Sequence, residues 1–334
     1  MRYIAKISLG LEDIIKESLP KFLKGAGRLS FYDDLLDFEF GGEMSQVLKY
    51  PLFSAAFVVI HKFTENETSF RKMSQKLAAD YIEIKKSISG FKNIKTFRVR
   101  YFTEKGLVSV DEFTKGLDEQ YIQKRTSLRP NRIKPDIEFY FVSRRDSQNY
   151  FAVRIEKYSE SEKQKAGELK PEIAYATVYK SDIQKGDVVL DVFGKYGALA
   201  FTANKYFKDI KVVVGDWESK MVTDMKSRAK AIMGRQPEVI KLNPVDMQPI
   251  VSESINRIIT EMPTNKHEGA TEELYSGFLK EATRVIKPNG SIFLLVQEPQ
   301  LLMQSLEEHT NLVVKSQIIL KSSKVYNLYQ LKKR

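Results

Sequence analysis

The chain has 334 residues, 42% of them hydrophobic, which is enough for two domains with cores of their own. It has no cysteine and only three histidines (His61, His267 and His309), far apart in sequence. Disulfides and thiolate catalysis are therefore excluded, and we expect no metal site. The 54 basic residues outnumber the 43 acidic ones, and the net charge of +11 favours a polyanionic partner.

The N-terminus is amphipathic and contains acids, unlike a signal peptide, and no apolar run approaches membrane-spanning length. We therefore expect a soluble cytoplasmic protein that does not bind a membrane.

Residues 1–84 show the short alternating and helical patterns of a small α+β unit, which we interpret as ferredoxin-like. Strands are expected at 3–9, 35–40 and 55–63, and helices at 11–23, 44–50 and 70–88. This segment is nearly neutral, so its expected role is structural.

Residues 85–157 are expected to form a more basic α+β region, with strands at 95–101, 137–143 and 149–155 and a helix at 110–125. Between Lys85 and Arg145, 15 basic residues stand against 7 acidic ones. A basic face with interleaved aromatics fits phosphate contacts plus base stacking, and a solvated lysine-rich surface fits the charge equally well. The aromatic candidates are Phe97, Tyr101, Phe102 and Tyr121. The candidate RNA-binding residues are Lys95, Arg98, Arg100, Lys124, Arg125, Arg129, Arg132 and Lys134.

A charged stretch at 158–168 is expected to be a linker, and from 169 to 334 strand and helix patterns alternate, as in a doubly wound Rossmann-like α/β domain. Strands are expected at 188–193, 211–214, near 239, at 255–260 and at 291–296. The segments 312–320 and 325–331 are expected to pair antiparallel at the far edge of the sheet. Helices are expected at 198–207, 219–233 and 270–286 and from 300 onward.

The first two of these strands carry the pattern of a nucleotide site. A buried apolar run contains Asp191 and leads into a turn with Gly194 and Gly197, and the second strand ends at Asp216. The turn allows close approach of a ligand, and the second acid can hold a ribose diol. Acids that merely cap turns are the alternative. The glycines are spaced G-x-x-G rather than G-x-G-x-x-G, which disfavours a dinucleotide and suits S-adenosylmethionine.

Two further residues are candidates for contacts with the adenine. Trp217 follows the ribose acid and either lies along the adenine or belongs to the core. Asp246, in the loop after the strand near 239, either accepts from the adenine amino group or is a surface acid.

Several segments resemble a known family. GLEDIIKESL is similar to the opening of RNA-modifying enzymes with a THUMP domain, and KTFRVRYF with KPDIEFYFV resembles that RNA-binding domain itself. The run from Leu169 to Ala174 (LKPEIA) is similar to the family's L-x-P-x-I-A segment, and RVIKPNG to the turn before the fifth strand of many methyltransferases. The nearest group is the THUMP-containing tRNA guanine-N2 methyltransferases.

This resemblance implies a THUMP-like module at 85–157 and an S-adenosylmethionine-dependent methyltransferase domain at 169–334. It places Leu169 with the cofactor and makes RNA, tRNA in particular, the partner.

The sequence departs from the family at two places. The family's D-P-x-x-G-x-G turn reads DVFGKYG here, so Lys195 replaces a glycine and must point away from the cofactor or occupy its methionine site. The (N/D)-P-P-(Y/F) tip reads EMPT. There Glu261 and the Pro263 carbonyl could accept the N–H bonds of an exocyclic amine. Thr264, in the aromatic position, cannot stack a base, so stacking would fall to Tyr196 or Tyr275.

Two hypotheses follow. One is a methyltransferase acting on the exocyclic amine of a tRNA guanosine. The other is a catalytically inactive RNA-binding protein with the same fold, in which Glu261 is a surface or helix-start acid. The sequence leaves open whether a partner subunit completes the site.

Overall fold

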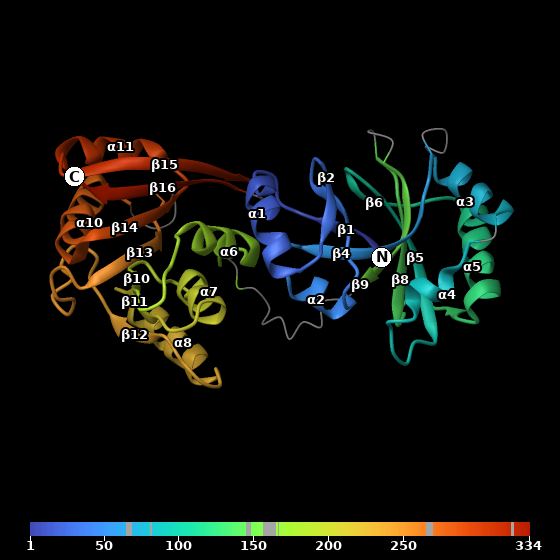
Figure 1. Ribbon diagram of the computed structural model, residues 1–334, viewed down its shortest axis with the longest axis horizontal. Coiled ribbons are helices and arrows are strands. Elements are labelled where there is room, and N and C mark those ends of the chain that lie inside the picture. The colour runs from blue at the N-terminus through green and yellow to red at the C-terminus, as the bar shows by residue number, and fades with distance from the viewer. Residues whose placement is uncertain are drawn as a thin grey trace. The chain divides into compact units, whose positions relative to one another are not determined.

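A computed structural model describes residues 1–64, 69–80, 82–144, 148–155, 165, 167–264, 270–321 and 324–334. The chain divides into two compact units, one of Met1–Ile7 with Ile15–Glu160 and the other of Ser8–Ile14 with Ser161–Arg334. Each unit is built on its own β-sheet (Figure 1).

The N-terminal unit contains a mixed sheet with nine strands among the described residues. They run in the order β2-β3-β1-β4-β9-β8-β5-β6, and β7 pairs with β5. The strands are β1 (Arg2–Lys6), β2 (Gly27–Tyr32), β3 (Leu35–Glu39), β4 (Ala55–Lys62), β5 (Thr96–Thr103), β6 (Gly106–Val108), β7 (Arg129–Pro130), β8 (Ile137–Val142) and β9 (Tyr150–Ile155). The helices are α1 (Glu12–Phe22), α2 (Met44–Lys49), α3 (Phe70–Ala79), α4 (Ile84–Ile88) and α5 (Glu112–Thr126).

The alternation of β5 separates the two faces of this sheet. Phe97, Val99 and Tyr101 are buried on the face that α3 and α5 cover. There the Tyr101 ring packs edge-on against Phe70 of α3, with centroids 5.3 Å apart. The opposite face carries Arg98 and Arg100.

Two expectations for this unit were wrong. The helix expected over 70–88 is two helices, because Asp80 leaves the helical conformation with a ψ of 149° and ends α3. Strand β2 was not expected, since its residues are half-exposed without clear alternation and Arg28 has a φ of 51°.

The C-terminal unit contains a doubly wound sheet in the order β12-β11-β10-β13-β14-β16-β15. The first five strands are parallel and the last two antiparallel, as predicted for the far edge. The strands are β10 (Val188–Asp191), β11 (Lys211–Asp216), β12 (Glu238–Lys241), β13 (Ile255–Glu261), β14 (Ile286–Val296), β15 (Leu312–Lys321) and β16 (Val325–Lys333).

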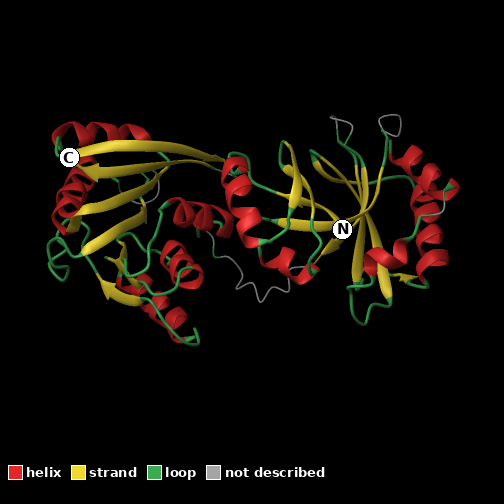
Figure 2. Cartoon of the chain, in the orientation of Figure 1, coloured by secondary structure: helices red, strands yellow, loops and turns green. Residues whose placement is uncertain are grey.

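Helices cover both faces of this sheet (Figure 2). They are α6 (Pro171–Lys180), α7 (Ala198–Tyr206), α8 (Ser219–Lys230), α10 (Glu272–Val285) and α11 (Pro299–Glu308). The buried core on the α10 side joins Leu190, Ile258 and Ile292 of the strands to Phe278 and Leu302 of the helices. The predicted Rossmann-like fold is confirmed.

Candidate functional site

Three acids lie at the carboxyl ends of three neighbouring parallel strands. Asp191 ends β10, Asp216 ends β11 and Glu261 ends β13, with β10 between the other two. All three are more than nine-tenths buried. In doubly wound sheets ligands bind at the carboxyl ends of the parallel strands, so the three acids mark the candidate site.

Asp191 connects the elements at the carboxyl ends of these strands. Its Oδ1 accepts a hydrogen bond from the Thr260 hydroxyl (2.8 Å), and its carboxylate also accepts one from the backbone of Ala200 in α7. Thr260 Oγ1 in turn accepts from the backbone N–H of Phe193 (2.9 Å). Burial raises the pKa of Asp191 to about 7. Asp191 therefore ties β10, β13 and α7 together at the site.

Asp216 fixes the turn after β10. Its Oδ2 accepts the backbone N–H of Lys195 and its Oδ1 that of Glu218, both at 2.8 Å. Each carboxylate oxygen has a further lone pair, so the side chain can still accept from a ligand hydroxyl.

The two glycines of the turn are required by packing within the protein. A Cβ at Gly194 would lie 2.6 Å from Val214 Cγ2 and 2.8 Å from the Gly215 carbonyl oxygen of β11. Gly197 has a φ of +80°, and a Cβ there would collide with the Phe201 ring. The glycines bring the turn against β11 and begin α7.

A cavity of about 840 Å³ opens beside Asp216. Its walls include Lys195 and Tyr196 of the glycine turn, Asp216 at the end of β11 with Trp217 after it, the loop 242–245 after β12, and Pro263 after β13. Trp217 is 62% exposed, which excludes the core interpretation of this residue. Asp246 is exposed and does not line the cavity, whereas Asn243 in the same loop does.

Lys195 turns toward Glu261. Its Nζ lies 3.8 Å from Glu261 Oε2, and Gln297 Nε2 donates to Glu261 Oε1 at 3.3 Å. The space left among Leu169, Asp191, Gly194, Lys195 and Glu261 is about 10 Å³, room for no more than one water molecule. The ion pair thus fills the gap between the ends of β10 and β13.

The tip after β13 differs from expectation in one respect. The Tyr275 hydroxyl donates to the Pro263 carbonyl at 2.9 Å, and Tyr275 is only 1% exposed. Tyr275 therefore cannot stack a substrate base, and that interpretation was wrong. Tyr196 is half-exposed on the cavity wall and can stack. Thr264 is half-exposed beyond Pro263, and His267 lies outside the described residues.

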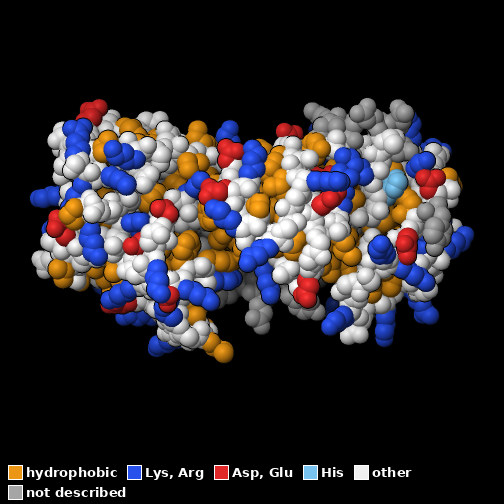
Figure 3. Space-filling model, in the orientation of Figure 1, with side chains coloured by type: hydrophobic (Ala, Val, Ile, Leu, Met, Phe, Trp, Pro, Cys, Tyr) orange, Lys and Arg blue, Asp and Glu red, His pale blue; other side chains and the backbone are white. Residues whose placement is uncertain are grey.

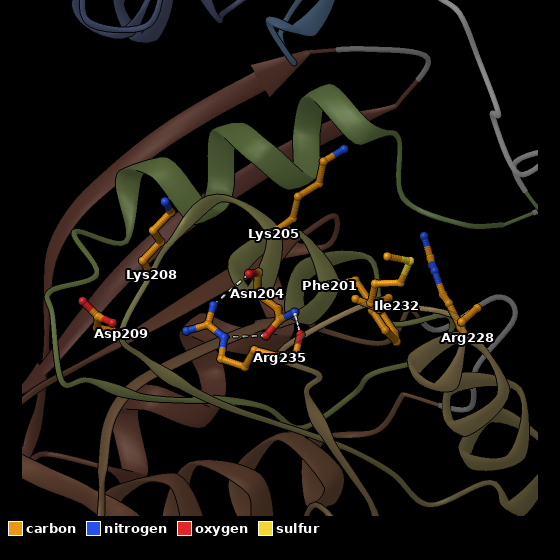
Figure 4. A pocket seen from close by; sticks show the side chains of 10 residues that line it. Phe201, Asn204, Lys205, Lys208, Asp209, Arg228, Ile232 and Arg235 are labelled. Atoms are coloured by element: carbon orange, nitrogen blue, oxygen red, sulfur yellow. Dashed lines mark hydrogen bonds between the residues drawn. The ribbon is translucent and has the colours of Figure 1, made fainter.

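A second cavity, of about 690 Å³, lies between the carboxyl-terminal ends of α7 and α8 (Figure 4). Arg235 crosses it and donates to Asn204 Oδ1 at 3.1 Å and to the Ile210 carbonyl at 2.9 Å. Because helices run antiparallel to the strands, this cavity lies at the amino ends of the strands. None of the three strand-end acids lines it.

Half of the predicted RNA-binding residues form contacts within the protein. Arg98 and Arg100 pair with Glu138, Arg132 with Glu112 and Glu119, and Arg125 lies over the Tyr121 ring. The other four, Lys95, Lys124, Arg129 and Lys134, are exposed.

The aromatic candidates of this region are mostly core residues. Phe97, Tyr101 and Tyr121 are at most 5% exposed and cannot stack on RNA, whereas Phe102 is half-exposed. Lys and Arg side chains are spread over the face seen in Figure 3 rather than gathered in one patch.

The fold of the C-terminal unit is a methyltransferase fold. Residues 160–325, just under half of the chain, match the family model UPF0020, described as an RMKL-like methyltransferase domain. These findings support S-adenosylmethionine as the cofactor, as predicted.

Solved structures similar to the whole chain agree on the fold. TrmN from Thermus thermophilus has a TM-score of 0.80 at 18% identity, covering 100% of this chain and 99% of that one. SMU.472, a putative methyltransferase complexed with SAH, has a TM-score of 0.75 at 13% identity, covering 100% and 98%. A predicted N6-adenine-specific DNA methylase from Listeria monocytogenes has a TM-score of 0.71 at 14% identity, covering 98% and 95%. A search of curated proteins found no match.

No described helix is long and apolar enough to cross a membrane. The described residues also contain no cluster of three or more His, Cys, Asp or Glu side chains that could hold a metal ion.

Proposed function

We propose that the protein is an RNA methyltransferase that uses S-adenosylmethionine to methylate the exocyclic N2 amine of a guanosine in tRNA. The observation that carries the proposal is the 840 Å³ cavity bounded by Asp216 and Trp217 and reaching Pro263, two residues beyond Glu261. Its volume lies within the range of small-molecule sites, about 300–1,000 Å³.

The adenosine part of the cofactor fits this cavity. The free lone pairs of Asp216 suit the two ribose hydroxyls, and the exposed Trp217 ring offers a face for adenine. Asn243 offers an amide, where Asp246 was predicted, for the polar edge of the base. Trp217, Asp216 and Asn243 would thus hold the base and ribose.

The acceptor end is formed by Glu261 and Pro263. When bound, the cofactor supplies a methyl group on a sulfonium, and transfer requires an amine lone pair directed at it. Glu261 and the Pro263 carbonyl oxygen can each accept an N–H of the amine, which increases electron density on its nitrogen. The Pro263 oxygen already accepts from Tyr275, and its second lone pair is left for the substrate. Tyr196 would stack the base.

The proposal of an RNA partner rests on the positive net charge and on the resemblance of the N-terminal segments to THUMP-bearing tRNA guanine-N2 methyltransferases. The exposed Lys95, Lys124, Arg129 and Lys134 remain available for phosphate contacts, which need no precise geometry. A guanosine N2 target follows from that resemblance alone.

One observation favours the second candidate, an inactive RNA-binding protein. The Lys195–Glu261 pair fills the space toward which the cofactor's amino acid end would extend, and it neutralises the proposed acceptor. An active enzyme must break this pair and swing the Lys195 side chain away.

Titration with S-adenosylmethionine, S-adenosylhomocysteine and adenosine separates the two candidates. Trp217 is the only tryptophan, so its fluorescence reports this cavity directly. If Lys195 blocks the amino acid end, Lys195→Gly will tighten binding of both full-length ligands about tenfold and leave adenosine unchanged. Lys208→Ala, an exposed lysine in the second cavity, is the matched control.

Activity is tested by incubating the protein with unmodified tRNA and S-adenosylmethionine and identifying methylated nucleosides by mass spectrometry. N2-methylguanosine formed by the wild type and lost in Glu261→Ala supports the enzyme. Ligand binding without any methylated nucleoside would favour the inactive protein, and no adenosine binding in any variant would contradict the cofactor site itself.

A further inference from the structure

The sheet of the N-terminal unit has a face that carries its own apolar cluster. Ile4, Leu35, Tyr140, Val142, Tyr150 and Ala152 form it, with Tyr32, Phe57, Val59 and Phe102 packed around them. Every one of these residues lies on a strand, whereas the helices pack on the opposite face through residues such as Tyr101. Within the described part of the chain, no helix residue belongs to this apolar cluster.

A cavity of about 180 Å³ lies within this face. Tyr140 and Val142 of β8 contribute to its lining, together with Phe57 of β4 and Phe102 of β5. The Phe57 and Tyr140 rings meet edge to face with centroids 5.0 Å apart. Leu107 of β6, 55% exposed, completes the wall. The space is smaller than the sites of drug-sized ligands and suits one flat ring.

Cations surround this cavity. Lys6 places its Nζ 5.4 Å from the Phe102 ring centroid and 3.9 Å from Asp34 Oδ2, and its side chain is 47% exposed. Arg154, 41% exposed, lies 3.4 Å from Glu138 Oε2. Both ion pairs are at the surface, where such pairs contribute little and can give way to a phosphate. Arg144 is buried and donates to Asp34 Oδ1 at 2.8 Å. Among the residues that line the cavity, three cations thus stand against one acid, Asp34.

We propose that this cavity takes one unpaired nucleobase of an RNA strand, with the neighbouring phosphates held by Lys6 and Arg154. The inference rests on the proposed RNA substrate and adds a site apart from the predicted lysines and arginines between 95 and 134. Aromatic walls bind a base through its flat face, and exposed cations attract the backbone on either side. A base in a duplex cannot enter, so the site selects single-stranded segments.

The test compares binding of a fluorescently labelled single-stranded RNA with binding of its duplex, using the full chain. Phe102→Ala should weaken binding of the single strand about tenfold, the order expected for one stacked base, and change duplex binding little. Phe113→Ala is the matched control, since Phe113 is a 69% exposed phenylalanine of α5 that does not line the cavity. Lys6→Gln should reduce the salt dependence of single-strand binding.

Photocrosslinking of a 5-iodouridine oligonucleotide to the unaltered protein makes the test independent of any variant's folding. Crosslinks in peptides of β5 or β8 support the site, whereas crosslinks confined to 124–134 would overturn it. Single-strand binding that Phe102→Ala leaves unchanged overturns this inference alone. A wild type that binds neither RNA contradicts the proposed function as well.

Discussion

Each of the two sheets is associated with a buried aspartate whose pKa burial raises to about 7, yet only one of them lies at a candidate site. Asp118 of α5 accepts from the Tyr101 hydroxyl at 2.6 Å and from Ser74 of α3 at 3.0 Å. Asp191 accepts from Thr260 at the carboxyl end of a parallel strand. The same raised pKa therefore belongs to Asp118, which packs helices against a sheet, and to Asp191, which lies at the candidate ligand site.

The difference lies in the surroundings of each acid. Asp118 is enclosed by α3, α5 and β5 and lines neither the strand-end cavity nor the sheet-face cavity. Asp191 is followed within four residues by Phe193 and Lys195 on the wall of the 840 Å³ cavity. A perturbed pKa alone does not locate a functional site. What distinguishes Asp191 from Asp118 is its position at the carboxyl end of a parallel strand, where doubly wound sheets bind ligands.

The largest expected effect concerns Asp118 and the stability of the N-terminal unit. Because the folded-state pKa lies above the ordinary 3.8, the folded unit keeps the proton to higher pH than the unfolded chain does. Its free energy of unfolding should fall as pH rises from about 4 to about 7, by at most about 4 kcal/mol. Hydrogen exchange of peptides from β5 and α5 across this pH range measures the slope.

Asp118→Asn should remove most of that slope. Both hydroxyls donate to Oδ2, and Oδ1 accepts no hydrogen bond within the described residues, so an amide nitrogen can replace Oδ1. Unfolding of the C-terminal unit, followed by Trp217 fluorescence, serves as the internal control: its pH dependence, to which Asp191 contributes, should be the same in Asp118→Asn as in the wild type. A slope retained in the variant would assign the pH dependence to another group.

The next effect concerns ligand binding at the strand ends. Asp216→Ala removes the proposed ribose acceptor and two hydrogen bonds to the turn, so the affinity for S-adenosylmethionine should fall about 100-fold, or about 2.7 kcal/mol. Calorimetric titration measures the affinity. Asp209→Ala is the control, since Asp209 is an exposed acid near the amino ends of the strands. A change below about threefold in Asp216→Ala would remove Asp216 from the proposed site.

The strand-end architecture was predictable because its signals are local. The apolar runs ending at Asp191 and Asp216, with a glycine turn between them, indicate β10, α7 and β11 from the sequence alone. The departure at Lys195 was also visible. Its pairing with Glu261 was not, since the two residues are far apart in sequence and meet only because β10 and β13 are neighbours.

The N-terminal sheet was harder to interpret from sequence because its ion pairs join residues on different strands. Alternation in β5 placed Arg98 and Arg100 on one face, but Glu138, which neutralises both, belongs to β8, 40 and 38 positions away. Nor did the pattern show which face the helices cover, and so Phe97 and Tyr101 were mistaken for stacking residues. The lining of the cavity around Phe102 comes from seven strands, β1, β3, β4, β5, β6, β8 and β9, and no local pattern indicates it.

The smallest expected effect concerns Trp217 and completes the contrast with Asp118. Trp217 is 62% exposed, so Trp217→Ala should leave the free energy of unfolding nearly unchanged. Removing the ring face proposed for adenine should weaken the binding of S-adenosylmethionine and of adenosine by the same factor, about tenfold, because both contain the base. Trp217→Phe, which keeps an aromatic ring, should restore most of the affinity in the same calorimetric titration. Equal affinities in all three proteins would mean that the cavity holds its ligand without this wall. An affinity loss confined to Trp217→Ala, with an unchanged free energy of unfolding, would show that this exposed side chain contributes to binding and not to stability.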